Sequence, residues 1–207
     1  MGASPERPGI LPATPENVRR AADLVRAGEL AIVPTETVYG VAARADAPAA
    51  LAKLYAAKDR DESKRIALLA PGLDAVRAAG ARVDAVAERL AAAFWPGPLT
   101  LVLPTATGNW EGFRVPAHPI ALAWLRELAL LPAVTSANRS GQPAAKTAAA
   151  AWADLAPHVA VALDAGPCAA GAASTVVQVL AGDVQILRHG PIGRAALAQA
   201  AGCPVRE

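Results

Sequence analysis

The feature that most constrains the fold is a repeated change between short apolar runs and segments that look like helices. The apolar runs lie at 30–33, 66–70, 99–103, 133–135 and 159–163. Runs of this length bounded by turn residues are typical of buried strands. The segments between them begin with capping residues and carry apolar residues at helical spacing. Strands that alternate with helices predict an α/β fold.

Capping residues place the helices that we expect. Thr14 before Pro15 predicts a helix that ends near Gly28, and Asp46 is expected to cap a second helix that ends near Lys58. Further helices are predicted over 74–79, 84–94, 119–128, 147–155 and 194–200. Two runs around Gly182 predict a hairpin, which would make the sheet mixed. We expect residues 1–13 to be a loose N-terminal segment and residues 14–207 to form a single domain.

Composition limits the class of protein. Hydrophobic residues make up 54% of the chain, whereas the net charge of +2 is far below the excess of a dedicated nucleic-acid binder. The two cysteines and three histidines have no spacing typical of a disulfide framework or of a metal site: Cys168, Cys203, His118, His158 and His189. The sequence shows no signal peptide and no membrane-spanning run, so we expect a cytoplasmic protein that binds no membrane.

Polar side chains gather where the predicted strands begin or end. Pro34 should end the first strand, and Thr35, Glu36 and Thr37 follow it directly. Ligands of open α/β sheets bind at such strand ends, although an ordinary polar turn explains this stretch equally well. Other polar residues at strand ends are Lys58, Arg60, Arg114, Ser136, Asn138, Ser174 and Arg188.

Several cations beside Gly-rich and Ser-rich loops suit a substrate with many negative oxygens, such as a nucleotide polyphosphate. The chain contains no Gly-Lys-Ser or Gly-Lys-Thr of a P-loop and no G-x-G-x-x-G pattern. No Ser/His/Asp or Cys/His arrangement stands out either.

Seven short motifs in a fixed order make the prediction specific. They are Pro-Thr-Glu-Thr-Val-Tyr-Gly at 34–40, Lys-x-Arg at 58–60, Trp-Pro-Gly-Pro-Leu-Thr at 95–100, Arg-Val-Pro at 114–116, Ser-Ala-Asn-x-Ser-Gly at 136–141, Ser-Thr-Val-Val at 174–177 and Leu-Arg-x-Gly at 187–190. Together they closely resemble the YrdC-like family, the threonylcarbamoyl-adenylate synthases. The resemblance covers about residues 15–200. The chain ends soon after the last motif, so we expect the short, single-domain form.

The resemblance implies a twisted, open, mixed sheet with helices packed on it and a concave basic face. It also implies an enzyme, a nucleotidyltransferase that joins L-threonine, bicarbonate and ATP into threonylcarbamoyl-adenylate and pyrophosphate. The product would serve the threonylcarbamoylation of adenosine 37 in tRNA, through downstream transferase components. Mg²⁺ is expected with the ATP phosphates, with no ligand from a protein side chain, and no organic cofactor is expected.

The resemblance also implies roles for residues. Lys58, Arg60 and Arg188 would face phosphates, and no protein nucleophile is needed. Ser136 and Asn138 would hold the nucleotide. Threonine would be bound by Thr35, Arg114 and Ser174, with the guanidinium pairing the amino-acid carboxylate in bidentate fashion.

The sequence departs from the family pattern at several positions. Asp61 and Arg65 stand where prolines are common, and Ala144-Ala145-Lys146 replaces a common Ser-Pro-Thr. Two alternatives remain: a non-catalytic module that binds double-stranded RNA or tRNA through the same face, and a carbamoyl-adenylate enzyme with another donor. The second occurs in much longer chains with zinc-finger and acylphosphatase segments, which are not found in this sequence.

Overall fold

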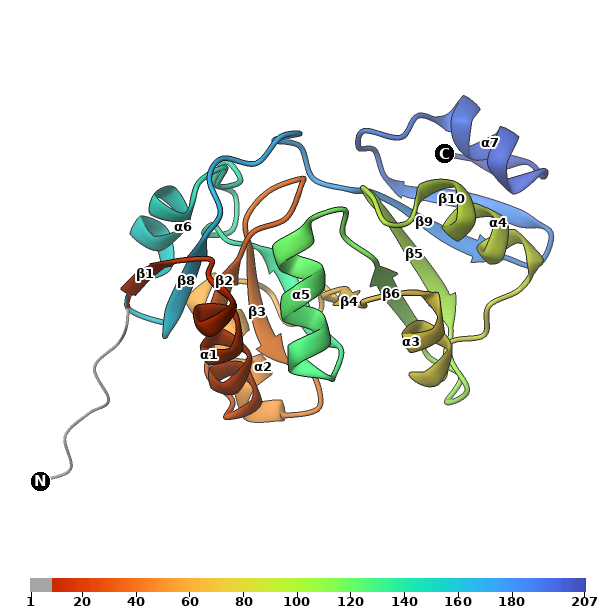
Figure 1. The fold of residues 1–207 in the computed structure, drawn as a ribbon. Coiled ribbons are helices and arrows are strands. Elements are labelled where there is room, and N and C mark those ends of the chain that lie inside the picture. Colours follow the sequence, from red (N-terminus) through yellow and green to blue (C-terminus); the bar gives the residue numbers. More distant parts are fainter. Residues whose placement is uncertain (1–8) are drawn as a thin grey trace, which may run out of the picture.

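A computed structural model describes residues 9–207, which build one open sheet with helices on both of its faces (Figure 1). Its strands are β1 (Gly9–Pro12), β2 (Ala31–Val33), β3 (Gly40–Arg44), β4 (Leu68–Leu69), β5 (Leu99–Pro104), β6 (Trp110–Arg114), β7 (Pro132–Ser136), β8 (Val161–Asp164), β9 (Thr175–Leu180), β10 (Asp183–Arg188) and β11 (Val205–Arg206). They lie in the order β1-β8-β2-β3-β7-β4-β6-β5-β9-β10-β11. Parallel and antiparallel pairs both occur, and the two end strands do not pair with each other, which confirms the open, mixed α/β sheet.

The helices begin largely where their capping residues predict. They are α1 (Pro15–Arg26), α2 (Pro48–Ala57), α3 (Leu73–Ala78), α4 (Ala85–Phe94), α5 (Pro119–Leu128), α6 (Ala148–Leu155) and α7 (Arg194–Ala201). The side chains of Thr14, Asp84 and Thr147 accept hydrogen bonds from the first turns of α1, α4 and α6. The expectation for Asp46 was wrong, because α2 begins after Ala47 and Asp46 instead pairs with the Arg44 guanidinium.

Three strands were missed because their pairing is set by distant parts of the chain. Residues 9–12, expected to be loose, form β1 and pair in parallel with β8. The rest of that expected segment lies outside the described residues. β3 follows the polar turn at 35–39 where no strand was predicted, and it pairs antiparallel with both β2 and β7. The two-residue β11 adds to β10.

Helices cover both faces of the sheet around β8, β2 and β3. α1 and α5 lie on one face, where Ala22, Trp124 and Leu163 belong to one buried cluster. α2 and α6 lie on the other face, where Leu54 and Leu155 belong to a second cluster. We call this part, β1, β8, β2 and β3, the doubly covered half.

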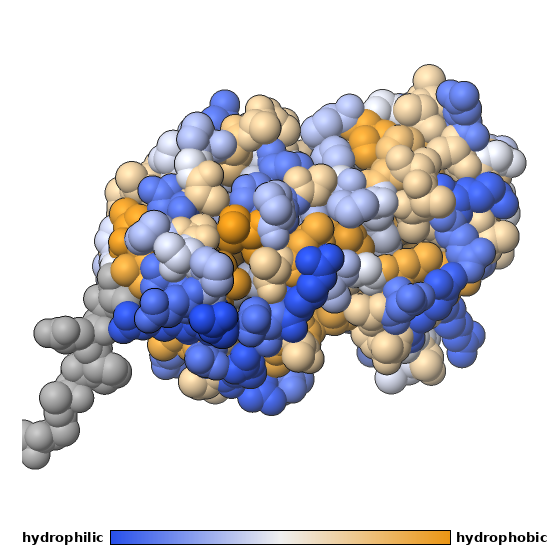
Figure 2. All heavy atoms as spheres, in the orientation of Figure 1, coloured by the Kyte–Doolittle hydropathy of each residue, from blue (hydrophilic) through white to orange (hydrophobic). Residues whose placement is uncertain are grey.

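The other end of the sheet is covered on one face only. α3, α4 and α7 pack there against β5, β6, β9 and β10, and the cluster includes Val76, Leu90, Leu101, Val177 and Leu197. We call these four strands the singly covered half. Figure 2, drawn from the same side as Figure 1, shows polar and apolar side chains interspersed over the surface. Over residues 9–207, no helix combines the length and the apolar character needed to cross a bilayer.

Candidate functional site

A cavity of about 380 Å³ lies between the uncovered face of the singly covered half and an opposite wall made by β7 and the turn at 35–38. Strand geometry decides which side chains reach it, because successive residues of a strand point to opposite faces. On β5, Leu99, Leu101 and Leu103 are in the core, whereas Thr100 and Val102 line the cavity. The same alternation on β6 and β9 sends Gly112, Arg114 and Val176 to the cavity and Phe113 and Val177 to the core.

A β-bulge in β10 changes this alternation at the edge of the cavity. Ile186 pairs with Val177, but Arg188 pairs with Val176, so the register shifts at Leu187. A bulge re-aims side chains locally. As a result the adjacent residues Leu187 and Arg188 both line the cavity.

Arg188 is bound to the loop that precedes β9. Its Nε and Nη2 donate to the Ser174 carbonyl oxygen at 3.1 and 2.9 Å, and Nη2 also donates to Ser174 Oγ at 3.1 Å. Ser174 Oγ in turn lies 2.9 Å from Thr100 Oγ1. Burial, followed by the nearby charges of Arg114 and Arg60, lowers the pKa of Arg188. Within residues 9–207 no carboxylate forms an ion pair with Arg188, so its charge is available to an anion.

Arg114 is held by three different residues. Its Nη2 donates to Glu36 Oε1 at 2.7 Å and to Thr37 Oγ1 at 2.8 Å, and its Nε donates to the Gly97 carbonyl at 3.1 Å. The side chain is only 9% exposed. Both edges of the guanidinium that could pair a carboxylate in bidentate fashion include an engaged nitrogen, Nε or Nη2. Within the described residues, Nη1 makes no hydrogen bond.

The hydroxyl of Thr35 closes a turn. It donates to the Val38 carbonyl at 2.6 Å and accepts from the backbone N–H groups of Thr37 and Val38. Thr35 and Thr37 both line the cavity, and their hydroxyls lie 2.8 Å apart. Thr35 and Thr37 therefore belong to a polar turn and line the cavity at the same time, so both interpretations of this stretch apply.

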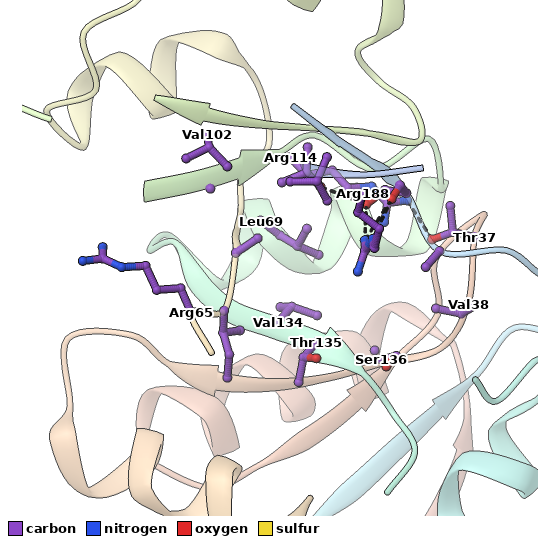
Figure 3. A pocket seen from close by; sticks show the side chains of 18 of the residues that line it. Thr37, Val38, Arg65, Leu69, Val102, Arg114, Val134, Thr135, Ser136 and Arg188 are labelled. Atoms are coloured by element: carbon purple, nitrogen blue, oxygen red, sulfur yellow. Dashed lines mark hydrogen bonds between the residues drawn. The ribbon is translucent and has the colours of Figure 1, made fainter. Parts of the chain in front are cut away.

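Two further arginines border the cavity. Arg60 donates to the carbonyls of Lys64 and Arg65 at 3.2 Å, which curls the 60–65 segment back on itself. Arg65 donates to the Trp110 carbonyl and lies 3.0 Å from a carboxylate oxygen of Glu111. In Figure 3, Arg114 and Arg188 lie together, whereas Arg65 extends away from them at the far side.

Lys58 and Asn138 were predicted as nucleotide ligands but do not line the cavity. The Lys58 ammonium is buried and donates to the carbonyls of Ser136 and Asn138. The Asn138 amide donates to the carbonyls of Arg139 and Gln142, both at 2.8 Å. Of the predicted site residues, the structure brings six to the cavity: Thr35, Arg60, Arg114, Ser136, Ser174 and Arg188.

Several residues that complete this arrangement had no role predicted from the sequence. Glu36 and Thr37 hold Arg114, and Thr100 contacts Ser174. A signal was present for each, since all three lie inside motifs that carried the family resemblance. The contacts of Arg65 had no such signal, because they depend on where β6 lies beside the 60–65 segment.

The sequence of this chain is similar to a known protein family and to several named proteins. The family model for Sua5, YciO and YrdC proteins, described as "Telomere recombination", matches residues 23–190. A Mycobacterium tuberculosis relative is 37% identical over 191 residues, which cover 88% of each chain. The Bacillus subtilis protein named threonylcarbamoyl-AMP synthase is 36% identical over 180 residues, covering 82% of this chain and 52% of its own.

A solved structure gives the same result. Pyrococcus abyssi Sua5, determined in complex with L-threonine, superposes with a TM-score of 0.87 at 29% identity, covering 95% of this chain and 61% of the other. The shared motifs, the open mixed sheet and these matches agree, and the chain belongs to the Sua5/YciO/YrdC family.

Proposed function

We propose that this protein is an L-threonylcarbamoyl-adenylate synthase, a nucleotidyltransferase that uses L-threonine, bicarbonate and ATP. One observation carries the proposal: the cavity of a Sua5/YciO/YrdC protein is lined by four arginines, Arg60, Arg65, Arg114 and Arg188. A substrate with several anionic oxygens matches such a lining. The cavity also has the size usual for a small-molecule site.

The reaction needs stabilised charge and no nucleophile from the protein. The threonine ammonium group and bicarbonate combine to a carbamate, with loss of water and a proton. A carbamate oxygen then bonds to the α-phosphorus of ATP, and the bond from that phosphorus to the bridging oxygen breaks, which releases pyrophosphate. Negative charge grows on the leaving phosphates, and fixed cations lower the barrier of such a transfer. Mg²⁺ arrives with ATP as part of that substrate.

The contacts within the cavity support adjacent positions for the two substrates. Arg188 and Arg60 are available to the phosphates, while Arg114 offers Nη1 to the threonine carboxylate. Ser174 contacts Arg188 directly at 3.1 Å, so a threonine bound beside Ser174 would lie next to phosphates bound by Arg188. That arrangement brings the carbamate to the α-phosphate without a large movement.

The product would be passed to tRNA-modifying transferase components, by analogy with the named activity of the relatives. The curated relatives carry the names of enzymes, which does not favour a non-catalytic double-stranded-RNA-binding module.

The test is an assay of pyrophosphate release with purified protein and a panel of amino acids. We expect release that requires both L-threonine and bicarbonate, with threonylcarbamoyl-adenylate detected by mass spectrometry. ATP turnover that is absent, or indifferent to threonine, contradicts the proposal. Specific binding of double-stranded RNA without any turnover would favour the RNA-binding module instead.

A further inference from the structure

Lys58 makes an unusual set of contacts with one loop. It lies directly after α2 and its side chain is 2% exposed. Its ammonium donates to the carbonyl oxygens of Ser136 and Asn138, and its own carbonyl accepts from Ser140 N at 3.0 Å. One residue therefore holds the 136–140 loop at three points.

The ammonium has no acidic partner. Among residues 9–207 no carboxylate lies within ion-pair distance of Lys58. Burial, and then the charge of Arg60, lowers the pKa of Lys58 to about 8, against a smaller opposite effect of the Asp154 carboxylate, which lies beyond ion-pair distance. A buried cation without a counter-ion opposes folding unless hydrogen bonds compensate it. The two carbonyls of the 136–140 loop provide those bonds.

The loop that Lys58 holds also borders the cavity. Ser136 lines the cavity at the end of β7, and Ala137 N donates to the Tyr39 carbonyl at 2.8 Å. The loop is thus fixed by Tyr39, the residue before β3, on one side and by Lys58 on the other. Asn138 is 6% exposed, and within the described residues its Oδ1 is buried without a hydrogen-bond partner.

We propose that Lys58 is a positioning residue, which sets the 136–140 loop for the nucleotide and does not contact the phosphates. The inference rests on the proposed function and changes the role that the family resemblance implied for this lysine. Lys58 is buried and does not line the cavity, so its ammonium would have to move away from both carbonyls to reach a phosphate. The Ser136 carbonyl would keep the Asn138 N–H at 3.0 Å, but the Asn138 carbonyl would lose the ammonium donor. Arg60, two residues further on, already lines the cavity and can meet the phosphates.

Three variants separate the two roles. Lys58→Met removes both the charge and the donors. Lys58→Gln keeps a hydrogen-bond donor but no charge. If Lys58 positions the loop, this variant should partly keep the loop in place. If Lys58 contacts a phosphate, the loss of charge should remove that contact. Lys53→Met is the matched control, because Lys53 lies on α2 and its half-exposed ammonium donates to Gly28 O at 3.2 Å and pairs with Glu29 at 2.9 Å, away from the 136–140 loop.

The first measurement is amide hydrogen exchange of residues 136–142 without substrates. We expect exchange at least ~10-fold faster in Lys58→Met, an intermediate rate in Lys58→Gln and no change in Lys53→Met. Unchanged exchange in Lys58→Met would overturn the inference. Failure of both Lys58 variants to fold would also overturn it, because a residue that positions one loop is not required by the whole fold.

The second measurement compares the affinities for ATP, AMP and pyrophosphate by calorimetry. A positioning role predicts that Lys58→Met weakens the binding of ATP and of AMP by similar factors and leaves the affinity for pyrophosphate unchanged. Selective loss of ATP and pyrophosphate binding with unchanged AMP binding would show a phosphate contact. If the wild-type protein shows no threonine-dependent turnover, the proposed function fails, while the exchange experiment still decides whether Lys58 holds the loop.

Discussion

The two halves of the sheet use the same strand geometry but bury different numbers of faces. In the doubly covered half, β2 alternates between Ile32 in one helix-covered cluster and Ala31 and Val33 in the other, and all three are buried. In the singly covered half, only alternate residues of β5 and β9 enter a core. Without a helical layer, this open sheet face forms one wall of the cavity, and β7 and the turn at 35–38 form the other.

The number of covered faces explains where polar residues can stand on the strands of each half. A strand buried on both faces needs a continuous apolar run, as in Leu30-Ala31-Ile32-Val33. A strand with one open face can carry Thr100 or Arg114 between core residues without burying an unpartnered polar group. The comparison predicts that neighbouring residues on one strand of the singly covered half have separable effects on stability and on function.

The largest effect is expected from substitutions on β5. Leu101→Ala removes a fully buried side chain and should lower the free energy of unfolding by ~2–5 kcal/mol. Val102→Ala, on the open face of the same strand, should cost about 1 kcal/mol or less. Chemical denaturation of both variants measures the difference. Equal losses would mean that the two faces are packed alike and would break the comparison.

The next effect concerns the open face itself. Arg188→Ala should lower the rate at saturating substrate ~100-fold, or about 2.7 kcal/mol, because charge on the leaving pyrophosphate grows in the transition state. Steady-state kinetics together with thermal unfolding test this. Arg82→Ala is the control, since Arg82 is exposed and does not line the cavity. A defect that appears only in the KM for ATP would show ground-state binding instead.

Arg114 should act mainly on threonine. The threonine carboxylate keeps its charge throughout the reaction, so Arg114→Ala should raise the apparent KM for threonine with a cost of ~1.5–3 kcal/mol. Because this change also leaves Glu36 without its cation, Arg114→Lys is a second variant that keeps the charge but loses the planar fork. Kinetics with threonine and ATP varied separately decide the matter. An unchanged threonine KM in both variants would place the amino acid elsewhere.

The lowered pKa of Lys58 predicts that the stability of the protein depends on pH. A folded-state pKa of about 8, against a usual 10.5, means that the folded protein loses this proton more readily than the unfolded chain. The cost of the buried charge is present below pH 8 and is relieved as pH rises toward 10.5. Relative to Lys58→Met, the wild type should gain ~2 kcal/mol of unfolding free energy between pH 7 and 10. Parallel stability curves would contradict the lowered pKa.

The smallest effect is expected at the cysteines. Burial raises the pKa of the Cys168 thiol, which keeps it protonated and unreactive near neutral pH. Neither Cys168 nor Cys203 lines the cavity. Replacement of both by Ala should leave turnover within a few-fold of wild type in the pyrophosphate assay. A loss beyond ~100-fold with the fold intact would assign them a chemical role.

The sequence alone determined the elements whose signals are local. Thr14, Asp84 and Thr147 cap helices because a hydroxyl or carboxylate can bond the first free N–H groups of its own segment. The motif order determined the family, and six of the predicted site residues do line one cavity.

Which partner each polar group contacts depends on the tertiary fold. β1 and β3 exist because β8, β2 and β7 supply their hydrogen bonds, and no local pattern encodes those pairings. The same holds for Lys58. Its ammonium donates to carbonyls of residues that lie 78 and 80 positions further along the chain. A sequence motif states that a cation is present, but the carbonyls and charges packed around it decide whether that cation faces the cavity or holds a loop.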